Sequence, residues 1–106
     1  MADQAQIDAH RKLAQQFGRN LVHARKRADL SQEQVGIRAS LHRTEIGMLE
    51  RGIRLPRLDT VVKLAGAIEV EPADLLDRIE WEPAIPSSGG YRIAPDDEEP
   101  DSEAPR

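Results

Sequence analysis

Two helix-start signals, eleven residues apart, constrain this chain more than any other feature of its sequence. In the first signal, Ser31 is followed three residues later by Gln34. These two side chains can bond the backbone N–H groups of each other's residue in the first turn of a helix. His42 and Glu45 repeat the spacing with a weaker capping residue, and we expect Glu45 to act as the partner of this second cap. The two signals predict two short helices in close succession.

The first of these helices is expected from Ser31 to about Ala39 and the second over about 43–51, where Gly52 ends it. Four apolar residues would point inward and fix the crossing angle: Val35, Leu41, Ile46 and Leu49. Gly36 has no side chain and allows the helices to approach closely across a tight turn at Ser40-Leu41. The outer face is then left with Arg43, Thr44, Gly47 and Met48. This layout is typical of a helix-turn-helix, whose second helix lies in the major groove of DNA.

Three further helical patterns complete the predicted fold. Apolar residues at helical spacing predict a helix over about 7–28 and another over about 57–68. A short helix starts at Pro72, a residue suited to a first helical position, and extends to about Ile79. The expected fold class is all-α, a compact five-helix domain over residues 1–80 in which residues 1–6 are a short extension.

The remaining residues, 81–106, are rich in Pro and Gly and end in an acidic run. Such a composition cannot bury enough apolar surface to fold by itself, so we expect an irregular tail that is partly disordered, from Pro95 onward. Trp81 and the Tyr91-Arg92-Ile93 triplet are more apolar than a free tail needs, and they could fold back on the helices.

The charges of the chain are divided by position. The formal net charge is −4, yet residues 11–57 hold 11 Lys and Arg against 4 Asp and Glu, while residues 79–106 hold 2 against 8. This asymmetry indicates either a basic working surface with a separate acidic tail or an ordinary solvated helical surface. We hypothesise that the tail competes with DNA phosphate for the arginines; the alternative is a tail that only aids solubility.

The segments LSQEQVGIRAS, RTEIGMLERG and LPRLDTVVKLAGAIEVEPADLL, between about Phe17 and Leu76, resemble the XRE/Cro-type family of phage-repressor-like regulators. The resemblance implies a lambda-repressor-like fold and the function of a sequence-specific DNA-binding transcriptional regulator. Three departures from the family pattern are Ser40, where glycine is usual in the turn, His42, where serine or threonine is usual at the cap, and Leu55, where a polar phosphate-binding residue is common.

The resemblance also assigns roles to individual residues. The base-contacting positions are Arg43, Thr44, Gly47 and Met48. Gln32 matches a position that binds a DNA phosphate through its side chain and the helix N-terminus. Arg25 and Glu50 match a buried ion pair between the first helix and the recognition helix. Further expected phosphate contacts are His42 and four arginines, namely Arg38, Arg51, Arg54 and Arg57.

The sequence contains no pattern of catalytic or metal-binding residues. There is no cysteine, and the spacing of His10, His23 and His42 does not suit a metal. No glycine-rich phosphate loop or Ser/His/Asp arrangement is present, and a domain this small leaves little room for a pocket. We therefore expect a protein that is not an enzyme and has no cofactor.

Location and partners follow from the same reasoning. No apolar run approaches the ~20 residues that span a bilayer, and the first residues lack a secretory signal, so we expect no membrane association and a cytoplasmic, nucleoid-associated protein. The expected partners are double-stranded DNA and a second copy of the chain, because one recognition helix reads only a few base pairs.

Two alternatives remain open. The chain could be a helix-turn-helix module for protein–protein interaction, favoured by apolar residues expected on the surface at Met48, Ile53 and Leu55. It could also be a DNA-binding antitoxin whose acidic tail binds a partner protein.

Overall fold

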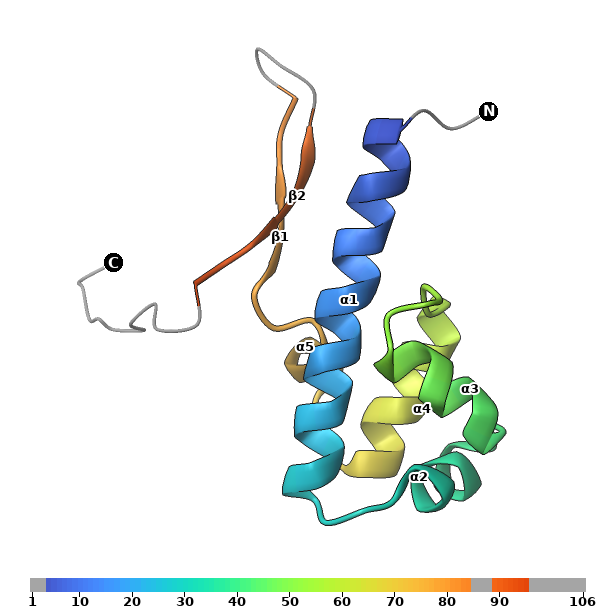
Figure 1. Cartoon of the computed structure of the whole chain (residues 1–106). Coiled ribbons are helices and arrows are strands. Elements are labelled where there is room, and N and C mark those ends of the chain that lie inside the picture. The colour runs from blue at the N-terminus through green and yellow to red at the C-terminus, as the bar shows by residue number, and fades with distance from the viewer. Residues whose placement is uncertain (1–3, 85–88, 96–106) are drawn as a thin grey trace, which may run out of the picture.

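The computed structural model describes residues 4–84 and 89–95 of the chain. Their elements in order are α1 (Gln4–Arg27), α2 (Gln32–Ala39), α3 (Arg43–Glu50), α4 (Leu58–Ile68), α5 (Pro72–Leu75), β1 (Ile79–Glu82) and β2 (Gly90–Ile93). Figure 1 shows α2 to α5 gathered beside the C-terminal half of the long helix α1, with the two strands beside its N-terminal half. The prediction of a compact five-helix fold is confirmed, and the strands are an addition to it.

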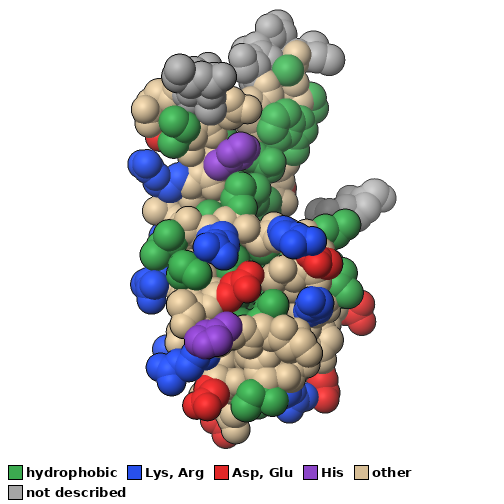
Figure 2. All heavy atoms as spheres, turned by 90° about the vertical axis from the view of Figure 1, so that its right-hand side faces the viewer, with side chains coloured by type: hydrophobic (Ala, Val, Ile, Leu, Met, Phe, Trp, Pro, Cys, Tyr) green, Lys and Arg blue, Asp and Glu red, His purple; other side chains and the backbone are tan. Residues whose placement is uncertain are grey.

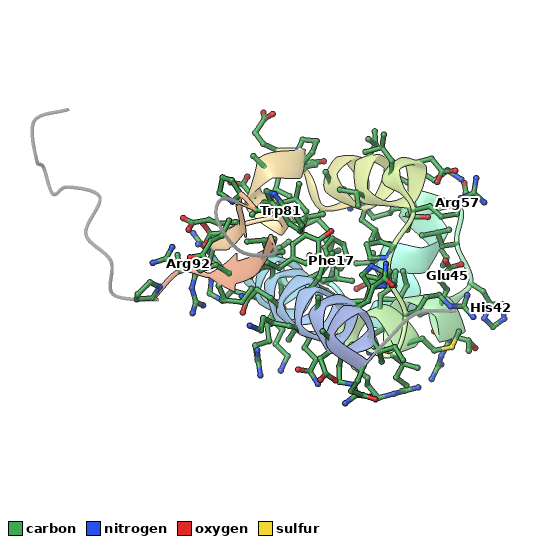
Figure 3. All side chains as sticks on the ribbon, turned by 90° about the horizontal axis from the view of Figure 1, so that it is seen from above. Phe17, His42, Glu45, Arg57, Trp81 and Arg92 are labelled. Carbon is green, nitrogen blue, oxygen red and sulfur yellow. The ribbon has the colours of Figure 1, made fainter. Side chains whose placement is uncertain are left out.

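The core lies between the C-terminal half of α1 and the four shorter helices. Its largest fully buried side chains are Phe17, Leu21, Val35, Ile46, Leu49, Leu64 and Leu75. The inward direction predicted for the apolar residues of α2 and α3 is therefore correct, and Leu41 packs half-buried against the same cluster. In Figure 3, Phe17 lies in the middle of the molecule, between the helices and the strands. No helix of the described residues combines the length and apolar character needed to cross a membrane.

Both predicted caps are formed, although by different hydrogen bonds. At α2, the Gln34 N–H donates to Ser31 Oγ (3.0 Å) and the Ser31 N–H donates to Gln34 Oε1 (2.7 Å), which completes the reciprocal box. At α3, the Thr44 N–H donates to His42 Nδ1 (3.1 Å). The prediction for Glu45 is wrong, because its carboxylate accepts no hydrogen bond from any described residue, and the imidazole alone caps the helix.

The turn between α2 and α3 has the geometry expected from its residues. Ser40 adopts the left-handed conformation, with φ 59° and ψ 43°, where the family pattern usually has glycine. A Cβ on Gly36 would lie 2.6 Å from the Leu41 carbonyl oxygen, so the close approach predicted there is real. Gly18 of α1 has a similar role that its sequence context did not reveal, since a Cβ would lie 2.6 Å from the carbonyl oxygens of both Leu49 and Glu50.

The segment after α5 differs from the prediction. The last helix ends at Leu75 instead of near Ile79, and β1 and β2 form an antiparallel hairpin within a region expected to be irregular. Trp81 stands opposite Tyr91, with ring centroids 5.2 Å apart in an edge-to-face arrangement. The hairpin rests against α1, so the expected folding back of Trp81 and 91–93 toward the helices is observed. The acidic run and the disorder predicted for it lie outside the described residues.

Reciprocal hydrogen bonds between Arg78 and Ala94 close the base of the hairpin. The Ala94 N–H donates to the Arg78 carbonyl oxygen and the Arg78 Nε donates to the Ala94 carbonyl oxygen, each at 2.7 Å. Arg78 has a positive φ of 70°, which turns the chain from α5 into β1. The strands are separated only by residues 83–89, and the alternation of apolar and charged residues in Ile79-Glu80-Trp81-Glu82 and Tyr91-Arg92-Ile93 is the strand signal that the sequence-based prediction missed.

Candidate nucleic-acid interface

Helix α3 lies at the surface with one side packed on α1 and α2. In Figure 3 the labelled residues His42 and Glu45, at the start of α3, lie on the side of the molecule opposite to Trp81 and Arg92 of the hairpin. The helix-turn-helix therefore faces away from the hairpin. The side of α3 that does not pack on α1 and α2 is not covered by any other described element.

The N-terminal end of α3 presents three exposed residues in succession, His42, Arg43 and Thr44. Capping uses His42 Nδ1 as an acceptor, so the proton of the neutral ring is on Nε2. Arg43 forms no hydrogen bond or ion pair with the described residues, and its five N–H donors are available to a ligand. A free guanidinium at the positive end of a helix is suited to phosphate oxygens and to the acceptor edge of guanine.

The next turn of α3 differs from the expectation for its outer face. Met48 is half-buried, and Gly47, which lies on the outward side of the helix, is covered by neighbouring side chains; its expected base contact stays a prediction. The space where a Cβ would project from Gly47 is bordered by the side chains of Arg51 (Nη1 at 3.5 Å) and Gln32 (Oε1 at 3.8 Å). Those two side chains form the outer surface at this position.

The ion pair between α1 and α3 is present and nearly buried. Arg25 Nε lies 2.5 Å from Glu50 Oε2 and Arg25 Nη2 lies 3.1 Å from Glu50 Oε1, with side chains 12% and 5% exposed. Arg25 Nη1 also donates to the Leu30 carbonyl oxygen at 2.8 Å. Gln32 Nε2 donates to Glu50 Oε1 at 2.8 Å, a contact that was not predicted from the sequence. One carboxylate thus ties α1, α2 and α3 together and fixes the angle at which α3 is presented.

The remaining arginines fall into two groups. Arg38 pairs with Glu69 at 3.1 Å and Arg57 pairs with Asp59 at 3.3 Å, both on exposed side chains where an ion pair contributes little. Arg51 and Arg54 are exposed and form no ion pair with the described residues. Figure 2 shows the α3 side of the molecule, where basic side chains are spread over the face with hydrophobic and acidic side chains between them.

A second surface feature was not anticipated. A solvent-open cavity of about 790 Å³ lies between α1 and the segment 70–78, although little room for a pocket was expected. Its walls carry both signs of charge, including Arg19, Arg27, Asp74 and Asp77. Among the described residues, no group of three His, Cys, Asp or Glu side chains is placed to hold a metal ion.

Comparison with known proteins agrees with this geometry. The family model described as a helix-turn-helix domain matches residues 16–79, from the middle of α1 to the first residue of β1. This chain belongs to the helix-turn-helix family. The predicted membership of the XRE/Cro-type regulators is confirmed.

Two relatives of this helix-turn-helix protein are controller proteins. The control protein C.BamHI of Bacillus amyloliquefaciens is 40% identical over 62 residues, which cover 58% of this chain and 76% of that protein. The restriction-modification controller protein C.AhdI of Aeromonas hydrophila is 37% identical, with a TM-score of 0.57 over 58% of this chain and 94% of the other. These relatives are regulators, in agreement with the prediction that the protein is not an enzyme.

The structure of the clp gene regulator ClgR of Corynebacterium glutamicum shares the fold at 19% identity, with a TM-score of 0.58 over 60% of this chain and 83% of the other. The matched family segment leaves out residues 4–15 of α1 and nearly all of the hairpin. These two parts are thus an addition to the common helix-turn-helix unit.

Proposed function

We propose that the protein is a sequence-specific DNA-binding transcriptional regulator that inserts α3 into the major groove. The observation that carries this proposal is the exposed, unpaired Arg43 at the N-terminus of a helix whose orientation is fixed by the Arg25–Glu50–Gln32 contacts. A rigid helix with a free guanidinium at its leading end is suited to base recognition, because each good bidentate contact discriminates by about 1–3 kcal/mol.

The other predicted contacts take supporting roles in this proposal. Thr44 and Met48 border the base edges next to Arg43. The phosphates of the DNA backbone on either side of α3 are contacted by His42, Arg51 and Arg54. Arg38 and Arg57 join them after each exchanges its exposed carboxylate partner for a phosphate. The side chain of Gln32 is committed to Glu50, so its phosphate contact would use the backbone N–H at the start of α2.

The protein is proposed to act as a cytoplasmic, nucleoid-associated homodimer on a two-fold symmetric site. An eight-residue recognition helix is about 12 Å long and spans only a few base pairs, so a second copy is needed to lengthen the site. The similarity to C.BamHI and C.AhdI favours a control protein that governs the expression of specific genes.

The test is selection of binding sites from random and genomic duplex DNA by the purified full chain, followed by the same titrations with two variants. Arg43→Ala should lower affinity for the selected site by about 5- to 150-fold and relax the preference at one base position. Arg54→Ala is the matched control and should weaken all sequences alike. Failure of the wild-type protein to enrich any sequence would refute the proposal.

A second candidate function rests on exposed apolar side chains beside α3. Ile53 is 64% exposed and Leu55 also lies at the surface, in the loop that follows the recognition helix. An antitoxin would bind its partner through the acidic tail, whereas a helix-turn-helix module for protein partners would use such a surface. In that case Ile53→Ser would abolish partner binding and Arg43→Ala would have no effect on it.

A further inference from the structure

The side chain of Arg51 lies back along the recognition helix, over Gly47. Its Nη1 atom is 3.5 Å from the point that a Cβ of Gly47 would occupy, although Arg51 is the residue directly after the end of α3. Side chains of a helix lean toward its N-terminus, and residues four apart lie on the same face. The guanidinium of Arg51 therefore reaches back about 6 Å, one helical turn, into the middle of the outward face.

Gly47 is the residue that makes this placement possible. The glycine is buried although it lies on the outward side of α3, because the side chains of Arg51 and Gln32 cover it. Any long side chain at this position would occupy the space that the guanidinium now fills. A methyl group would not, since 3.5 Å is ordinary van der Waals contact.

The donors of Arg51 are also uncommitted. Arg51 forms no ion pair or hydrogen bond with the described residues, unlike Arg25, Arg38 and Arg57. Its neighbour Gln32 is fixed, because the amide nitrogen donates to Glu50. The guanidinium and this amide thus border the same space beside Gly47, and Arg51 is exposed to solvent and shares the helix face of Thr44 and Met48 by its spacing.

We propose that Arg51 is a specificity-determining residue that contacts a base edge, with guanine as its preferred base, through the space that Gly47 leaves open. The inference rests on the proposed insertion of α3 into the major groove and changes the role of Arg51 from the phosphate contact suggested by sequence. A guanidinium one turn inside the helix is placed near the groove floor, and its planar fork matches the two acceptors of guanine.

The experiment repeats the site selection with four variants of the full chain, after thermal melts have shown that each is folded. Arg51→Ala should lower affinity for the selected site by about 5- to 150-fold and flatten the preference at one base pair, distinct from the one affected by Arg43→Ala. Arg51→Lys keeps the charge and loses the fork, so it should relax the same base pair. Gly47→Gln should displace the guanidinium and alter that base pair too, whereas the control Gly66→Ala, in α4 and with no atom within 4 Å of the added carbon, should leave the selected site unchanged.

Equal losses on selected and random duplex in Arg51→Ala, with wild-type preference in Arg51→Lys, would overturn the inference and leave Arg51 as a phosphate contact. That result leaves the proposed function intact, because the wild-type protein would still select a site that Arg43→Ala relaxes. A wild-type protein that selects no site would instead refute the proposed function and this inference together.

Discussion

Replacement of Arg25 by alanine tests the view that one buried carboxylate holds the recognition helix in place. In the variant, Glu50 would keep its hydrogen bond from Gln32 but lose two N–H donors and the positive charge that balances it. The Glu50 side chain is only 5% exposed, so water cannot replace the lost donors without opening the contact between α1 and α3.

The expected loss is large for a domain of this size. Removal of one member of a buried, hydrogen-bonded ion pair typically costs about 3–5 kcal/mol. Domains of this kind have a free energy of unfolding of about 5–15 kcal/mol, so the variant would lose a substantial share of it. Even a loss of about 3 kcal/mol corresponds to a fall in Tm of about 12–24 °C.

The measurement is thermal and urea unfolding followed by circular dichroism of the helices, with Arg38→Ala as the matched control. Arg38 and Glu69 also form an ion pair, but their side chains are 43% and 77% exposed, so its loss should cost less than about 1 kcal/mol. The double variant Arg25→Leu/Glu50→Met should recover most of the stability, because no buried charge remains unpaired. An Arg25→Ala protein as stable as the Arg38→Ala control would refute the reasoning.

Three further substitutions probe the backbone. Gly18→Ala should destabilise the protein by about 1–3 kcal/mol despite a better helix propensity, because the new methyl group would lie 2.6 Å from two carbonyl oxygens of α3. Gly66→Ala, with no atom within 4 Å of the added carbon, should raise the free energy of unfolding by up to about 1 kcal/mol. Urea unfolding of the two glycine variants should therefore give stability changes of opposite sign. Ser40→Gly should raise stability by about 1 kcal/mol by relieving the left-handed conformation; a lower midpoint of unfolding would contradict this.

The helices of the protein could be predicted from sequence because their signals are local. The box at Ser31 and Gln34, the cap at His42 and the helix stop at Gly52 each depend on residues a few positions apart, and each is found in the structure. The pair of Arg25 and Glu50 was accessible only through the family resemblance, since nothing local links the two residues.

What was not predicted depends mainly on contacts between elements. The hairpin is the exception, because the alternating residues that pair Ile79 with Ile93 are a local signal, which the Pro- and Gly-rich composition of the segment obscured. The burial of Gly47 arises from the side chains of Gln32 and Arg51, which helical spacing alone does not place over it. The tight contact at Gly18 likewise appears only when α3 is packed on α1.

The position of Trp81 gives the chain a built-in optical probe. It is the single tryptophan of the sequence, it is 58% exposed, and it lies in the hairpin against Tyr91, on the side opposite to the start of α3. Its emission should therefore report the local opening of the hairpin, while far-ultraviolet circular dichroism reports the helices. Comparison of the two signals during unfolding would reveal whether the added hairpin and the helix-turn-helix unit melt as one cooperative body or in separate steps.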